Sequence, residues 1–114
     1  MEDLRIETIK GGNDSQVFKL TGPFTLGTMF DFQHLVREHK AAATIIDLSG
    51  VPYMDSAALG SLLGFHVSCA REGRKYALVG VGERLKTLFK VAGVDSVLVT
   101  YASADAAKNA GVGA

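Results

Sequence analysis

The sequence predicts an α/β domain with a mixed, mostly parallel sheet of about five strands and about four helices. Two N-terminal segments alternate apolar and polar residues, which is typical of half-exposed strands. After residue 26, short apolar runs alternate with longer segments of helical period. The resulting order, β-β-α-β-α-β-α-β-α, implies parallel strand pairs joined by helical crossovers. We expect residues 1–114 to form one domain of this kind.

The first two strands are predicted to pair as an antiparallel hairpin. In "LRIETIK", residues 4–10, Leu4, Ile6 and Thr8 share one side and charged residues share the other. The pattern resumes in "QVFKLTG", with Val17 or Phe18 and Leu20 facing the core. The connection from Gly11 to Ser15 is longer than a two-residue loop.

A helix and a central strand follow the hairpin. Residues 26–39 carry apolar side chains at helical spacing, namely Met29, Phe32, Leu35 and Val36. "ATIIDLSG", residues 43–50, is a short apolar run rich in β-branched residues. Such a run fits a strand that is covered on both faces of a parallel sheet.

The second half of the chain alternates helix and strand. Residues 56–72 read as a helix that ends at Gly73, and "KYALVGV" follows as a strand. In "GERLKTLFKVAG" one helical face holds Leu85, Leu88, Phe89 and Ala92, and Gly93 ends the helix. "DSVLVTY" is predicted to be a last short strand, and "SADAAKNAG" a final helix with Ser103 as its N-cap.

Composition narrows the function classes. Twelve basic and twelve acidic residues cancel, so we expect no direct nucleic-acid binding. Cys69 is the single cysteine, which excludes an intramolecular disulfide and a cysteine-based zinc cluster. The acidic start "MEDLRIE" does not resemble a secretory signal, and no apolar segment reaches the ~20 residues of a membrane span. These features predict a cytoplasmic protein with no membrane span.

No cofactor or metal site is predicted. His34 and His39 are five residues apart on different helix faces, and His66 reads as a packed residue of its own helix. "VGVGERLK" lacks the third glycine of a dinucleotide fingerprint, so Gly82 reads as a turn or cap residue.

The pair Asp55-Ser56 stands between two apolar segments, in "SGVPYMDSAALGSLLG". Asp is favoured at the N-cap, where its side chain accepts a hydrogen bond from a free backbone N–H of the first helical turn. Ser56 would then be the first helical residue, exposed beyond the end of a parallel strand, where α/β sheets place functional loops. The pair is therefore either a helix cap alone or a cap that also presents a modifiable hydroxyl.

Two stripes are predicted along the helix that begins at Ser56. Small residues recur at spacings of four, three and four, at Ala57, Ser61, Gly64 and Ser68. The larger Leu59, Leu62, Leu63 and His66 form another stripe that should face the sheet. The small stripe is either an ordinary helix surface or a flat face that another protein approaches closely.

The segment "IIDLSGVPYMDSAALGSLLG", followed by "GRKYALVGVGERLKTLFKVAGVDSVL", resembles the STAS domain of bacterial anti-sigma-factor antagonists. The family signature is an apolar strand, an Asp-Ser pair, then small residues and "LG" opening a helix. The resemblance covers about the last 70 residues, and nearly the whole chain if "VFKLTG" is the family's second strand. It implies the SpoIIAA-like fold, with the helices packed mainly on one side of the mixed sheet.

The resemblance also implies a function in partner switching. The serine after the Asp, here Ser56, is phosphorylated in that family by an anti-sigma factor that is a serine kinase, and a PP2C-type phosphatase reverses the reaction. Unphosphorylated antagonist binds the anti-sigma factor and frees sigma, whereas phosphorylated antagonist does not bind. The expected partner-binding residues are Asp55, Ser56, Ala57, Gly60, Ser61, Gly64 and Thr25. Such a protein is not an enzyme, and a homodimer is one open option for its oligomeric state.

Two positions depart from the family pattern. After "LTG" the family has an acidic residue, a hydrophobic one and an Asp, whereas this chain has Pro23, Phe24 and Thr25. It also has Ala58 where the family tends to have Gly, although Gly60 is retained. The missing Asp supports an alternative function, a STAS scaffold or transporter accessory that works by assembly without phosphorylation. A serine hydrolase is disfavoured because Met54 and Ala58 replace the glycines of a nucleophile elbow.

Overall fold

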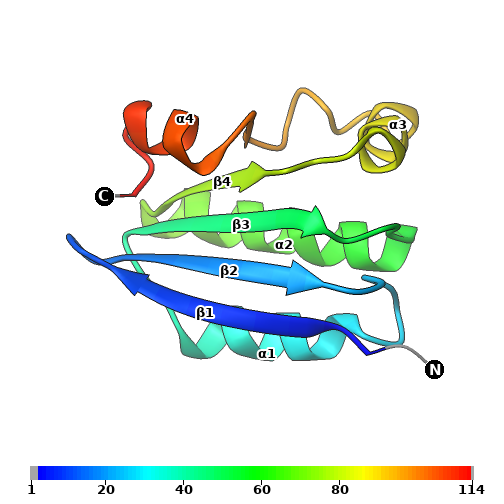
Figure 1. The fold of residues 1–114 in the computed structure, drawn as a ribbon, viewed down its shortest axis with the longest axis horizontal. Coiled ribbons are helices and arrows are strands. Elements are labelled where there is room, and N and C mark those ends of the chain that lie inside the picture. The colour runs from blue at the N-terminus through cyan, green and yellow to red at the C-terminus, as the bar shows by residue number, and fades with distance from the viewer. Residues whose placement is uncertain (1–2, 114) are drawn as a thin grey trace.

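The strands of the sheet lie side by side in chain order in the computed structural model, which describes residues 3–113 (Figure 1). They are β1 (Arg5–Gly11), β2 (Ser15–Thr21), β3 (Ala43–Gly50), β4 (Lys75–Val79) and β5 (Thr100–Tyr101). The helices are α1 (Met29–Glu38), α2 (Ser56–Glu72), α3 (Glu83–Val91) and α4 (Ala104–Asn109). The predicted element order is confirmed, while the predicted domain limits, residues 1 and 114, lie outside the described residues.

The sheet is mixed, as predicted. β1 and β2 are antiparallel, with Gly11 opposite Ser15, so residues 12–14 form a three-residue turn. Asn13 and Asp14 have φ of 57° and 54°, the left-handed backbone that these two residue types tolerate best after glycine. β3 pairs in parallel with both β2 and β4, and β5 adds to β4 in parallel.

β3 is the central strand, and its alternate side chains enter two separate cores. Ile46 and Leu48 belong to the larger core, which also holds Phe18 of β2. Ile45 belongs to a smaller core on the opposite face, with Val79 of β4. This two-sided burial explains why the strand reads as a continuous apolar run.

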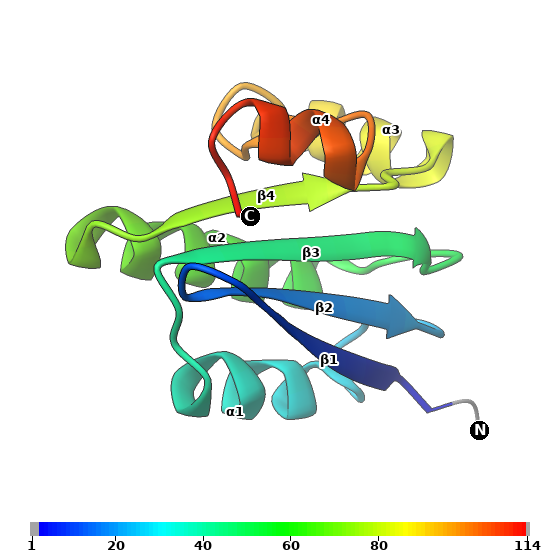
Figure 2. The same ribbon diagram turned by 60° about the vertical axis from the view of Figure 1, so that its left-hand side comes forward.

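Three helices cover one face of the sheet and the fourth covers the other (Figures 1 and 2). Phe32 of α1, Leu62 of α2 and Phe89 of α3 are buried in the larger core. Ala107 of α4 is buried in the smaller one. The helices therefore lie mainly on one side, which confirms the fold that the resemblance implied.

The main differences from the sequence prediction are at three element boundaries. α1 begins at Met29 and not at Leu26, because residues 25–28 form a turn before it. The last strand is only Thr100–Tyr101, because the N–H groups of Val97 and Leu98 both bond back to the carbonyl of Val94. Ala92 lies beyond the end of α3 and is exposed, so it does not share the buried face of Leu85 and Phe89.

Candidate functional site

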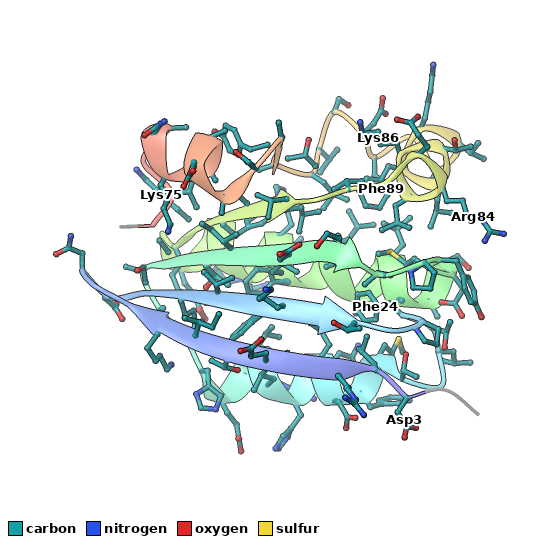
Figure 3. All side chains as sticks on the ribbon, viewed as in Figure 1. Asp3, Phe24, Lys75, Arg84, Lys86 and Phe89 are labelled. Atoms are coloured by element: carbon teal, nitrogen blue, oxygen red, sulfur yellow. The ribbon has the colours of Figure 1, made fainter. Side chains whose placement is uncertain are left out.

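The candidate site lies beyond the carboxyl ends of β2 and β3, where α2 begins. Two buried residues join the chain segments there: Phe24 follows β2, Met54 follows β3, and they form a parallel bridge. The N–H of Phe24 donates to the carbonyl of Tyr53, and the N–H of Asp55 donates to the carbonyl of Phe24. Phe24 therefore anchors the loop before α2 from inside the core (Figure 3).

Asp55 is the N-cap of α2, as predicted. Its Oδ1 accepts from the N–H of Ala58 at 2.9 Å, which satisfies one of the free donors of the first turn. Its Oδ2 accepts from the N–H of Leu26, also at 2.9 Å. One carboxylate therefore caps α2 and holds the loop after β2 against it.

Thr25 lies in that loop, in the closed turn that leads into α1. The carbonyl of Thr25 accepts from the N–H groups of Thr28 and Met29. The Thr28 hydroxyl accepts from the N–H of Thr25 at 3.0 Å and donates to the carbonyl of Pro23 at 2.8 Å. Thr25 directly precedes Leu26, whose N–H donates to Asp55. Thr28 is a positioning residue that the sequence analysis missed.

Ser56 is the first residue of α2 and is exposed. Its backbone position is fixed on one side by the Asp55 cap and on the other by the helix. The positive end of the helix dipole lies at this residue. The geometry therefore presents an accessible hydroxyl at a defined place.

The predicted stripe of small residues is only partly on the surface of α2. Gly60 and Gly64 are exposed, and Ala57 is half-buried. Ser61 is only 8 % exposed, and its hydroxyl donates to the carbonyl of Ala58 at 2.6 Å. The prediction that Ser61 belongs to a free outer face is wrong, because α1 packs beside this part of α2 and covers it.

Large apolar side chains are exposed on the segments that meet at Asp55. Leu26 is 56 % exposed, Phe30 in the first turn of α1 61 %, and Tyr53 46 %. We call these three residues together with Ser56 the switch surface. None of the three apolar residues was predicted from the sequence, although the position of Phe30 off the buried stripe of its helix indicates an exposed side chain.

The histidines do not belong to the switch surface. His66 Nδ1 lies 2.7 Å from the hydroxyl of Tyr76, which confirms that it is a packed residue of its helix. His34 pairs with Glu38 one turn along α1. Within residues 3–113, no three metal-ligating side chains come together.

Burial raises the pKa of the Cys69 thiol and that of the Tyr76 phenol, and both groups lie in the larger core.

One protein-family profile covers both the sheet and the loop that contains Asp55. The STAS domain profile matches residues 6–107, which include both sides of the switch surface. The chain belongs to the STAS domain family. This confirms the resemblance that the sequence "MDSAALG" carries.

Solved STAS structures share the fold at low sequence identity. A putative anti-sigma factor antagonist from Thermotoga maritima is 17 % identical, with a TM-score of 0.82 over 94 % of this chain and 92 % of its own. A sulfate transporter family protein from Wolinella succinogenes is 21 % identical, with a TM-score of 0.73 over 90 % and 88 %. The phosphorylated form of the Bacillus cell fate determinant SpoIIAA is 13 % identical, with a TM-score of 0.71 over 93 % and 99 %.

Two further findings are negative. No curated protein matches the sequence directly. Among residues 3–113, no helix has both the length and the apolar content that crossing a bilayer requires.

Proposed function

We propose that this STAS domain is an anti-sigma-factor antagonist that switches partners through phosphorylation of Ser56. The unphosphorylated protein binds an anti-sigma factor that is a serine kinase, and so frees a sigma factor. Kinase and PP2C-type phosphatase set the state of Ser56, and the protein acts in the cytoplasm by binding and not by catalysis. The observation that carries the proposal is an exposed serine directly after the capping Asp55, with exposed apolar side chains on the segments that meet at Asp55.

The switch surface explains how a phosphate would control binding. Exposed Leu26, Phe30 and Tyr53 provide apolar area that a partner buries on docking. A phosphate on Ser56 adds a charge of about −1.5 to −2 at this place. The Asp55 carboxylate next to it already accepts two backbone hydrogen bonds, and it offers the phosphate repulsion only. Desolvating that charge in a docked complex is unfavourable unless the partner supplies a cation.

The free protein accommodates the same phosphate more easily. Ser56 is exposed, so a phosphate there stays hydrated, and the positive end of the α2 dipole offsets part of its charge. Phosphorylation therefore acts on the complex more than on the fold. SpoIIAA, which has a known phosphorylated form, has the same fold and supports this proposal.

Incubation with ATP and the serine-kinase anti-sigma factor of the same organism tests the proposal. We expect one phosphate on Ser56 by mass spectrometry, and its removal by a PP2C-type phosphatase. Ser56→Ala should abolish the incorporation, and Ser49→Ala is the matched control because Ser49 is also exposed near the end of β3. No phosphate on Ser56, together with no binding to any such factor, would exclude the proposal.

A second candidate is a scaffold or transporter accessory that assembles without phosphorylation. It is favoured by Thr25, which stands where the antagonists have an Asp, and by the shared fold of the sulfate transporter family protein. A pull-down from the native organism separates the two. Recovery of a transporter subunit, unaffected by Ser56→Asp, would favour this candidate.

A further inference from the structure

A groove separates α1 from α2 on the helical side of the sheet. Its volume is about 320 Å³, and it is distinct from the switch surface. Its α2 wall carries Gly60, Gly64 and Ser68, which lie on successive turns and span about 12 Å along the helix. Its α1 wall carries Gln33, Val36 and Arg37. Ser61 and Phe65 complete the α2 wall, so the groove is elongated and small residues dominate its α2 side.

The two glycines of the groove have no role in internal packing. A Cβ added to Gly60 or Gly64 would meet no atom within 4 Å, and neither residue has the positive φ that favours glycine. Glycine inside a helix is unfavourable relative to alanine. Alanine would therefore fit at either position and would stabilise the helix, so the packing of the fold does not explain the two glycines.

The charges that line the groove are all positive. Arg37, Lys40 and Arg74 contribute to its lining, and no acidic residue does, although the whole chain is neutral. Glu72, outside the groove, binds Lys40 Nζ at 2.8 Å and Arg74 Nη2 at 2.8 Å. One carboxylate therefore balances three cations, which leaves about two positive charges at the groove.

Arg74 has an unused donor at this groove. Its side chain is only 10 % exposed, and its guanidinium lies over the ring of Phe65, 5.8 Å from the centroid. Nε and Nη2 both bind Glu72, but Nη1 is buried without a partner. Because Nη1 is covered, an acceptor in the groove does not reach it, and Arg74 contributes to the groove through its charge.

We propose that the groove between α1 and α2 binds an acidic segment of a protein partner. The segment carries two or more carboxylates, which approach Arg37 and Arg74, while its backbone lies against Gly60 and Gly64. A single small anion fits less well, because Lys40 and Arg74 already share the carboxylate of Glu72, whereas Arg37 lies on the opposite, α1 wall of the groove. The inference is independent of the phosphorylation of Ser56.

Fluorescence anisotropy with a labelled hexaglutamate peptide tests the inference at low and at 0.15 M salt. We expect saturable binding that Arg37→Glu weakens about tenfold or more. Gly64→Leu should weaken it similarly, because the new side chain fills the groove. The higher helix propensity of leucine favours the folded state of this variant. Arg71→Glu is the matched control, since Arg71 is exposed near the end of α2 but does not line the groove. It should change the affinity less than about twofold.

Three outcomes would overturn the inference. The first is no binding of hexaglutamate by the unaltered protein, or binding equal to that of hexaglutamine. The second is an equal loss in Arg71→Glu and Arg37→Glu, or no loss in Gly64→Leu, which would indicate unspecific attraction. The third is full competition by inorganic phosphate or acetate at matched ionic strength, which would make the groove a site for small anions.

Discussion

Asp55 holds the backbone N–H of Leu26 at 2.9 Å from its Oδ2, across 29 positions of the chain. Through this contact the loop after β2 and the start of α2 form one surface. The same carboxylate caps α2 through Oδ1, so the two roles of Asp55 are assigned to separate oxygens. Substitutions at this residue should therefore separate the stability of the helix from the position of the loop.

Asp55→Ala should lower the free energy of unfolding by about 2 kcal/mol, because it removes the cap and the link to Leu26. Asp55→Asn should lower it by about 1 kcal/mol, since the amide oxygen still caps the helix but the NH₂ group does not accept from Leu26. Urea denaturation measures both values. No loss in Asp55→Asn would show that the Leu26 contact contributes nothing, and equal losses in the two variants would show the same of the cap.

Tyr76 links β4 to α2 and to the segment before β5 through its hydroxyl. Its oxygen accepts from the N–H of Val99 at 3.1 Å and also shares a hydrogen bond with His66 Nδ1 at 2.7 Å. Tyr76→Phe should cost about 1–2 kcal/mol of stability, because the partly buried N–H of Val99 loses its acceptor. Thermal unfolding of this variant beside Tyr53→Phe, whose hydroxyl lies on an exposed residue, provides the comparison. A neutral Tyr76→Phe would contradict the hydrogen-bond assignment.

Cys69 should react slowly with thiol reagents in the folded protein. Its side chain is 1 % exposed, and burial raises the pKa of the thiol, so both access and the thiolate fraction are reduced. We expect labelling at pH 8 to be about 100-fold slower or more than in denaturing urea. Stopped-flow labelling measures the ratio. Comparable rates in the two conditions would place Cys69 at the surface.

Glu72 should titrate below the ordinary value of 4.5. The hydrogen bond from Lys40 is the main reason, and the ion pair with Arg74 lowers the pKa of Glu72 further. A carboxyl whose pKa is lowered on folding stabilises the protein above its ordinary pKa, and this contribution is lost as the pH falls through the folded value. NMR titration should show a higher Glu72 pKa in Lys40→Gln. An unchanged pKa would mean that the pair does not form in solution.

Periodicity in the sequence was sufficient to predict the order of strands and helices. The continuous apolar run of β3 and the caps at Asp55, Gly73 and Ser103 are local signals, and each lies where it was predicted. The long last strand was wrong, because the turn at Val94 depends on backbone bonds that side-chain pattern does not encode. Local patterns thus predict elements better than they predict where an edge strand enters the sheet.

The candidate site was only partly predictable. Asp55 and Ser56 follow from capping and motif, because they are adjacent in sequence. The contact between Leu26 and Asp55 depends on how β2 and β3 pair, and Ser61 is buried because α1 lies beside α2. Both features depend on tertiary contacts, so the sequence around α2 alone does not predict them.

The affinity of the protein for its serine-kinase anti-sigma factor, with and without phosphate on Ser56, tests the central proposal most directly. Isothermal titration calorimetry should show tight binding of the unmodified protein and of Ser56→Ala. Phosphorylated protein, and to a smaller extent Ser56→Asp, should bind at least about tenfold more weakly, since the added charge must be desolvated. Equal affinities for the phosphorylated and unmodified proteins would contradict the account.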